Sequence, residues 1–157
     1  MALYLSTFIN RIDSKGRVSV PAPFRAALVD ELYNGIVVFP SFSEIFNAVE
    51  ACGMARMERL SAGVDRLNPF SDEHDDFASV IFGASVQLPF DGEGRVILPD
   101  HLRAHAAIDD QAAFVGRGAT FQIWEPGALI DFQAEAQNRV RAGRAMLALD
   151  PPPGDGA

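Results

Sequence analysis

Residues 13–25 read DSKGRVSVPAPFR, and residues 91–103 read DGEGRVILPDHLR. Six of the thirteen aligned positions are identical, whereas two unrelated segments of this length would share about one residue by chance. The identical pairs are Asp13/Asp91, Gly16/Gly94, Arg17/Arg95, Val18/Val96, Pro21/Pro99 and Arg25/Arg103. The chain therefore contains one motif twice. Two copies are too few for a solenoid, which needs at least three stacked units, and they indicate two related half-domains.

Each copy is typical of a strand, a tight turn, a second strand and a short helix. The Asp and the first conserved Gly favour a turn, because Asp caps turns with its side chain and Gly accepts positive φ. Apolar and polar residues alternate over residues 8–12 and 17–20, which predicts a strand on each side of the first turn. Pro21 and Pro99 then end the second strand, and Pro is well suited to the start of a helix. The first copy continues with a helical pattern over residues 23–28.

The duplication also predicts where the remaining strands and helices lie in the sequence. The pattern of the second half predicts strands at 112–115 and 120–124 and a helix from Glu125 towards Arg144. By symmetry, the first half is predicted to have strands at 36–39 and 48–52 and a helix at 54–67. The local pattern alone would allow one long helix from Glu44 to Leu60 instead.

We therefore predict two similar halves, residues 1–67 and 83–145, joined by a connecting segment over residues 68–82. That segment is predicted to carry a further helix, capped by Ser71 and the acids that follow it. The tail, residues 146–157, is rich in proline and glycine, a composition that forms neither helix nor sheet and predicts disorder.

The composition sets wider limits. The 157 residues, 48% of them hydrophobic, suffice for one domain or two small halves with a buried core. The single cysteine, Cys52, excludes an internal disulfide and a zinc site built from several cysteines. Neither a basic leader with a cleavage site nor an apolar run of membrane-spanning length is present, from which we expect a cytoplasmic location.

The net charge of −8 is unusual for a DNA-binding protein, because contacts with phosphate favour a basic surface. The charges are unevenly distributed, however. Residues 1–25 contain four cations and one acid, whereas residues 72–76 contain four acids. Lys15, the only lysine of the chain, falls at the first predicted turn. The sequence thus predicts a locally basic edge on an acidic body, whose affinity for DNA would depend on repetition of that edge in an oligomer.

The paired D-x-x-G-R-x-x-x-P-x-x-x-R motif resembles that of the MraZ family, bacterial transcriptional regulators encoded at the head of the division and cell-wall gene cluster. The resemblance covers nearly the whole chain. It implies an α+β fold, the swapped-hairpin β-barrel of AbrB-like DNA-binding proteins, with both halves in one chain, pseudo-twofold symmetry and helices packed outside. It further implies ring-shaped homo-oligomers, octamers or dodecamers. Such rings would associate with the nucleoid and bind direct repeats of double-stranded DNA in the promoter of their own gene cluster.

The resemblance makes the basic tips of the two predicted hairpins the candidate DNA contacts. The candidates are Lys15, Arg17, Arg11 and Arg95. An arginine at such a tip could contact a base or a phosphate. Alternatively, it could be structural, paired with Asp13 or Asp91 or with a neighbouring helix end, or merely solvated. The second tip is expected to be electrostatically poorer, because Glu93 stands where the first copy has Lys15. Arg25 and Arg103, beyond the prolines, are expected to have structural roles.

An enzyme is not expected. His101 and His105 have the spacing of helical zinc ligands, with Asp100 and Asp109 nearby, but no H-E-x-x-H motif accompanies them and no third ligand is placed by the sequence. We therefore predict no metal site, no cofactor and no catalytic residue. Motifs for nucleophilic catalysis and for phosphate-binding loops are absent as well.

The alternative function is a ring-forming protein–protein scaffold without significant DNA binding. The acidic balance favours it, as do the 12 phenylalanines, which exceed the needs of a small core. The candidate interface residues are Phe8, Phe42, Phe46 and Phe70, for which a place in the core is the equal alternative. Salt dependence distinguishes the two functions, because DNA binding driven by phosphate contacts weakens steeply as salt rises.

Overall fold

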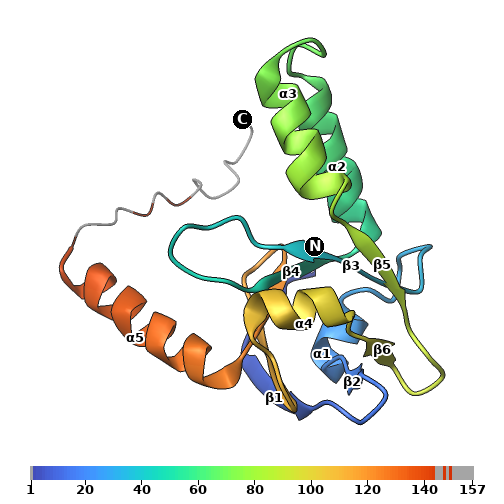
Figure 1. Cartoon of the computed structure of the whole chain (residues 1–157), viewed down its shortest axis with the longest axis vertical. Coiled ribbons are helices and arrows are strands. Elements are labelled where there is room, and N and C mark those ends of the chain that lie inside the picture. The colour runs from blue at the N-terminus through green and yellow to red at the C-terminus, as the bar shows by residue number, and fades with distance from the viewer. Residues whose placement is uncertain (1, 144–146, 148, 150–157) are drawn as a thin grey trace, which may run out of the picture.

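The computed structural model describes residues 2–143 together with Leu147 and Leu149. An antiparallel sheet of six strands, in the order β1-β7-β8-β4-β3-β5, and a two-stranded ribbon of β2 and β6 form its frame (Figure 1). The strands are β1 (Thr7–Arg11), β2 (Arg17–Ser19), β3 (Gly35–Pro40), β4 (Val49–Cys52), β5 (Val86–Pro89), β6 (Arg95–Ile97), β7 (Gln111–Gly116) and β8 (Phe121–Trp124). The helices are α1 (Ala22–Ala26), α2 (Met54–Asp65), α3 (Asp72–Phe77), the π-helical turn η1 (Ala78–Phe82), α4 (Asp100–Ala106) and α5 (Pro126–Arg141).

The mixed α+β class is confirmed, and so are the elements that the internal symmetry predicted. Strands β3 and β4 and helix α2 occupy the expected places. The alternative of one long helix from Glu44 to Leu60 is wrong, because β4 lies inside that range and pairs with both β3 and β8. The predicted cap of the connecting helix is also confirmed, since the Ser71 side chain accepts a hydrogen bond from the backbone N–H of His74.

The two motif copies have matching turns. Gly16 and Gly94 both have positive φ, 80° and 75°, and each donates its backbone N–H to the carbonyl of the Asp three residues earlier. Beyond these turns the strands diverge: β1 pairs with β7, while β2 pairs with β6 of the other copy. The exchange is reciprocal, because Val20 donates its N–H to the Gly94 carbonyl and Leu98 donates to that of Gly16. Each copy thus completes the hydrogen bonding of the other.

The main core lies between the sheet, the ribbon and the short helices α1 and α4. Val18 and Val96 lie opposite each other in the ribbon and are buried. Phe24 of α1 and Leu102 of α4, which align in the two motif copies, are both fully buried. Phe121 of β8 closes the cluster against Phe24, with ring centroids 4.9 Å apart.

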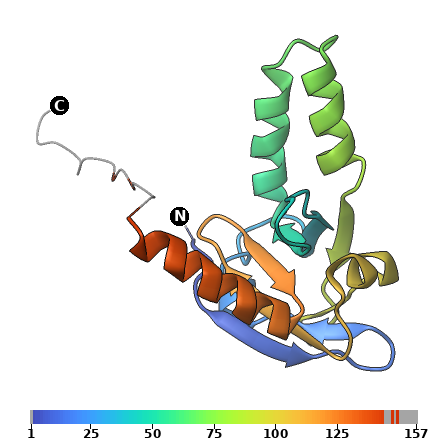
Figure 2. The ribbon, with the colours of Figure 1, turned by 60° about the vertical axis from the view of Figure 1, so that its left-hand side comes forward.

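Two helical units cover the opposite face of the sheet. Helices α2 and α3 form a hairpin that projects beyond the sheet, while α5 lies at the other side of the molecule (Figures 1 and 2). Met57 and Ile81 pack the α2–η1 unit against the strand side chains of Val37 and Cys52. Leu129 of α5 contributes to a separate cluster, which is buried around Trp124, Ala48 and Ala113.

Within the described residues, no helix combines the length and apolar character needed to cross a membrane. The tail predicted to be disordered, residues 146–157, lies outside the described residues except for Leu147 and Leu149.

Replacing Gly94 with Ala is expected to lower the free energy of unfolding by about 2–3 kcal/mol. The left-handed backbone costs an L-residue roughly 1–2 kcal/mol. A Cβ at this position would also lie 2.7 Å from the Arg25 side chain, whose Nε donates to the Val20 carbonyl; displacing that donor costs about 1 kcal/mol more. Chemical denaturation measures the change.

Two glycines provide the controls. Gly118 has a φ of 81°, but a Cβ added there would meet only open space, so Gly118→Ala isolates the backbone cost. Gly92, in the same turn as Gly94, has open space and no positive φ, so Gly92→Ala should change the free energy of unfolding by no more than about 0.5 kcal/mol. Equal effects of Gly94→Ala and Gly118→Ala would show that the Arg25 contact contributes nothing.

Candidate nucleic-acid interface

We call residues 13–17 the first tip and residues 91–95 the second tip. In the first tip, Asp13 Oδ1 accepts hydrogen bonds from the backbone N–H groups of Lys15 and Arg17, both at 2.9 Å. Its Oδ2 accepts the Arg17 Nε–H at 2.6 Å. A single carboxylate thus closes the turn and orients the arginine.

The second tip repeats this arrangement atom for atom. Asp91 Oδ1 accepts the backbone N–H groups of Glu93 and Arg95, both at 2.9 Å, and its Oδ2 accepts the Arg95 Nε–H at 2.8 Å. One difference follows from the sequence: Glu93 Oε2 lies 3.5 Å from Arg95 Nη2 and adds a second acid beside this arginine. The positive charge of Arg95 in the second tip is therefore compensated by two acids, whereas that of Arg17 in the first tip is compensated by one.

These hydrogen bonds shift the acidity of both aspartates. Donation from the backbone N–H of Arg17 is the main cause that lowers the pKa of Asp13, followed by the Arg17 side chain and the N–H of Lys15, while desolvation opposes the shift. The pKa of Asp91 is lowered in the same way, chiefly by the backbone N–H of Arg95. In turn, the hydrogen bond with Asp91 raises the pKa of Arg95. Both tips therefore hold ionised pairs at neutral pH.

The ribbon brings the two tip arginines onto one surface. Arg17 lies opposite Ile97, and Arg95 lies opposite Ser19. Because side chains alternate along a strand, these four residues share one face of the ribbon, while Val18 and Val96 point into the core. Ile97 and Ser19 are exposed, so this face is open to solvent.

The four predicted DNA contacts differ in their surroundings. Arg17 and Arg95 are half-buried, and each forms an ion pair with the aspartate of its own turn. The pairing with Asp13 or Asp91 that the sequence analysis gave as the structural alternative is therefore present. That pairing occupies Nε of Arg17; its terminal amino groups form no hydrogen bond or ion pair with a described residue. Lys15 is exposed beside Arg17. Arg11 is also exposed, but it ends β1, opposite Gln111 of the main sheet, and is not part of the ribbon.

Arg25 and Arg103 both make contacts within the fold. The Arg25 Nε donates to the Val20 carbonyl, and its side chain lies against Gly94 of the other copy. Arg103 donates to the Asp109 carbonyl and approaches Gly16. Each helix arginine thus reaches across to the tip glycine of the opposite copy, which supports the structural roles expected for them.

His101 and His105 lie one turn apart on α4, whereas His74 lies in α3. His105 Nε2 lies 3.3 Å from Ser41 Oγ, His101 is exposed, and His74 neighbours Asp75. In the part of the chain that the structure describes, no three His, Cys, Asp or Glu side chains are grouped so that they could hold a metal ion.

One series of hydrogen-bonded polar side chains in the sheet was not predicted from the sequence. Gln122 donates to Glu50 at 2.5 Å and accepts the indole N–H of Trp124 at 2.8 Å. The glutamine between apolar residues in the strand F-Q-I-W could have indicated a buried polar side chain here. Burial raises the pKa of Glu50, against the opposing effects of the Gln122 hydrogen bond and of Arg117.

The stability contributed by the two tip aspartates is expected to disappear in acid. Since their pKa values are lower in the folded protein than the ordinary 3.8, the contribution is complete above that value and is lost as the pH falls through the folded pKa. We expect the melting temperature of a variant with Asp13→Asn and Asp91→Asn to fall less than that of the wild type as the pH is lowered from about 5 to about 2.5, through the range in which aspartates titrate. Parallel curves would contradict the assignment.

In the comparison with known proteins, the matching family and the similar relatives carry the same family name. Residues 81–149 match the family described as "MraZ protein, putative antitoxin-like". The chain is 50% identical over 148 residues to the Rickettsia bellii (strain OSU 85-389) protein named "Transcriptional regulator MraZ", a match that covers 94% of this chain and 97% of that protein. It is 46% identical over 147 residues to the Rickettsia typhi protein of the same name, with the same coverage of both chains.

Proposed function

The chain belongs to the MraZ family of transcriptional regulators, and from that premise we propose that it is a sequence-specific DNA-binding regulator. Its target would be direct repeats in the promoter of its own division and cell-wall gene cluster. It would act in the cytoplasm, associated with the nucleoid, and without catalytic activity.

The observation that carries this proposal is the pair of aspartate-held arginines on one exposed ribbon. A two-stranded ribbon is narrow enough to enter the major groove of B-DNA. Asp13 holds Arg17 through Nε, which leaves its terminal amino groups for a base edge or a phosphate. Holding the side chain before DNA arrives lowers the entropy lost on binding. Lys15 would add a phosphate contact beside it, with Arg11 in support and Arg95 contributing less.

We propose further that the two halves, residues 1–67 and 83–145, form a swapped-hairpin barrel with pseudo-twofold symmetry, joined by residues 68–82. The reciprocal hydrogen bonds of Val20 with Gly94 and of Leu98 with Gly16 support this arrangement.

The active form is proposed to be a closed ring, an octamer or a dodecamer. Strands β1 and β5 are the edges of the main sheet, and edges favour pairing with another chain. Phe42 and Phe70 are exposed, the latter by 93%, and would suit subunit contacts; Phe8 and Phe46 instead pack against core clusters of the same chain. Light scattering that gave the mass of one 17.0 kDa chain at micromolar concentration would contradict the ring.

Footprinting on the DNA upstream of the protein's own gene tests the function directly, combined with affinity measured over a salt series. We expect protection of repeated sites and an affinity that falls steeply between about 50 and 200 mM salt. A ring that binds no upstream DNA at low salt would favour the scaffold function, for which the exposed Phe42 and Phe70 are the supporting observation.

A further inference from the structure

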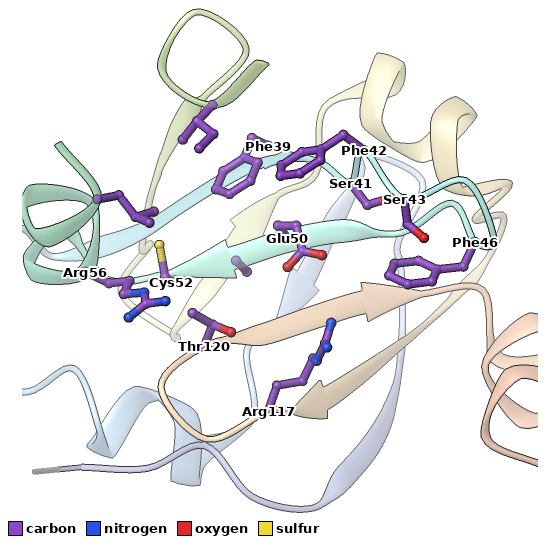
Figure 3. A pocket seen from close by; sticks show the side chains of 13 residues that line it. Phe39, Ser41, Phe42, Ser43, Phe46, Glu50, Cys52, Arg56, Arg117 and Thr120 are labelled. Carbon is purple, nitrogen blue, oxygen red and sulfur yellow. The ribbon is translucent and has the colours of Figure 1, made fainter. Parts of the chain in front are cut away.

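The sheet face that carries the two helical units contains a pocket of about 390 Å³ over its central strands (Figure 3). Phe39, Phe42 and Phe46 line one part of it, Glu50 of β4 lies at its floor, and Arg56 and Arg117 come from α2 and from the turn between β7 and β8. This volume is at the lower end of the range for small-molecule sites, enough for a single ring with a head group. The pocket combines apolar walls with a few charged groups, as ligand sites generally do.

The acidic side chain at the floor of the pocket, Glu50, already has a hydrogen-bond partner. Glu50 lies opposite Gln122 in the register of β4 and β8 and accepts a hydrogen bond from its Nε2. Burial raises the pKa of Glu50; the Gln122 hydrogen bond opposes this rise, and so does Arg117, which extends towards Glu50 from the turn between β7 and β8. Gln122 therefore already supplies a hydrogen bond to this carboxyl group.

Among the described residues, Arg56 Nε is the buried side-chain donor without a hydrogen-bond partner. Arg56 extends from the first turn of α2 and lies beside Cys52 at the end of β4 (Figure 3). Its Nε is buried and makes no hydrogen bond within the described part of the chain, and no described carboxylate lies within 4.0 Å of its guanidinium nitrogens. A buried donor without an acceptor is destabilising, and an anionic ligand would remove that cost.

We propose that this pocket binds a small organic anion, with its carboxylate or phosphate group held by Arg56 and an aromatic or branched apolar body against Phe39 and Phe42. The head group would accept charge-assisted hydrogen bonds from the guanidinium of Arg56, whose Nε has no acceptor within the described residues. The body would cover exposed aromatic surface, since the Phe42 side chain is 60% exposed without a ligand. Leu60 and Ile81 complete the apolar wall on the side of α2 and η1.

The protein contains its own reporter. Trp124 is the only tryptophan, and its ring centroid lies 5.0 Å from that of Phe46, a lining residue. Its indole N–H is also linked through Gln122 to Glu50 at the floor. Occupation of the pocket should therefore alter the fluorescence of Trp124.

The test titrates the whole protein with four probes that share one ring: phenylacetate, phenyl phosphate, 2-phenylethanol and phenethylamine. Trp124 fluorescence and ligand-observed NMR are recorded together, so that binding is detected even if the indole does not respond. We expect saturable binding of phenylacetate or phenyl phosphate with a Kd of about 1 mM or below, and the tighter of the two identifies the head group. The uncharged and cationic probes should bind at least about tenfold more weakly.

Two variants identify the cation. Arg56→Gln should weaken binding of the preferred anion by about tenfold or more, because a charge-assisted hydrogen bond is lost. Arg66→Gln, an exposed position at the end of the same helix and outside the pocket, should leave the affinity unchanged. Circular dichroism verifies that both variants are folded.

Three results would overturn the proposal: no saturable binding of either anion by either method, equal affinity for 2-phenylethanol, or equal effects of the two arginine variants. The assay contains no DNA, so its failure would leave the proposed regulatory function standing.

Discussion

Replacing Arg17 with Ala is expected to weaken binding to the proposed operator about 100-fold while the proposed oligomer remains intact. If each lost contact costs roughly 1 kcal/mol, two or three subunits engaged on adjacent repeats multiply the loss to this size. The oligomer should survive because Arg17 lies on the exposed face of the ribbon, with Val18 rather than Arg17 in the core. Fluorescence anisotropy with labelled operator DNA measures the affinity, and light scattering measures the mass.

The ion pair with Asp13 requires a control, because Arg17→Ala also removes an interaction of the turn. Asp13→Asn provides it: the amide oxygen can still accept the backbone N–H groups of Lys15 and Arg17, while the cation is kept. We expect this variant to bind DNA within a few-fold of the wild type. Arg95→Ala, the matched change in the more neutralised second tip, should have a smaller effect than Arg17→Ala.

Two outcomes would reject the assignment of Arg17. If Arg17→Ala bound the operator as tightly as the wild type in an intact ring, the first tip would not be the DNA-reading element, and the scaffold function would lead. If Asp13→Asn lost as much affinity as Arg17→Ala, the arginine would act through the shape of the turn and not through contact with DNA.

Replacing Phe24 with Ala is expected to lower the free energy of unfolding by about 3–5 kcal/mol. The ring is fully buried and packs against Tyr4, Phe8 and Phe121, with centroid distances of 5.4, 5.6 and 4.9 Å. Removing it leaves a cavity where the sheet, the ribbon and α1 meet, and the surrounding β-structure can close only part of it. Denaturant titration at a fixed protein concentration measures the change, because the stability of an oligomer depends on concentration.

Two further variants serve as comparisons for Phe24→Ala, one in the core and one at the surface. Leu102→Ala, at the matching position of the second copy, should cost about 2–5 kcal/mol, since Leu102 is also fully buried. Val29→Ala, just beyond α1 and 77% exposed, should change the free energy of unfolding by no more than about 0.5 kcal/mol. A loss below about 1 kcal/mol for Phe24→Ala, well under the usual range for a buried ring, would show that this core does not hold the two copies together.

The sequence by itself determined the local elements of this protein. The turns at Gly16 and Gly94 follow from a capping Asp and a glycine at positive φ, interactions that span only a few residues. The prolines at 21 and 99 precede helices for an equally local reason. The duplication added one result that propensity could not supply: it predicted β4 where the local pattern between Glu44 and Leu60 allowed a helix.

Only the tertiary structure decided which elements meet. That β1 pairs with β7 and β2 with β6 depends on contacts between residues far apart in the chain, such as Phe8 with Phe114, which no local periodicity encodes. The same holds for Arg25 against Gly94, where the two half-motifs bring a charged side chain and a turn together across the chain. The candidate site shows the same division. The basic tip could be predicted from the motif, whereas the pocket around Arg56 depends on how α2 packs against the sheet, which no local pattern encodes.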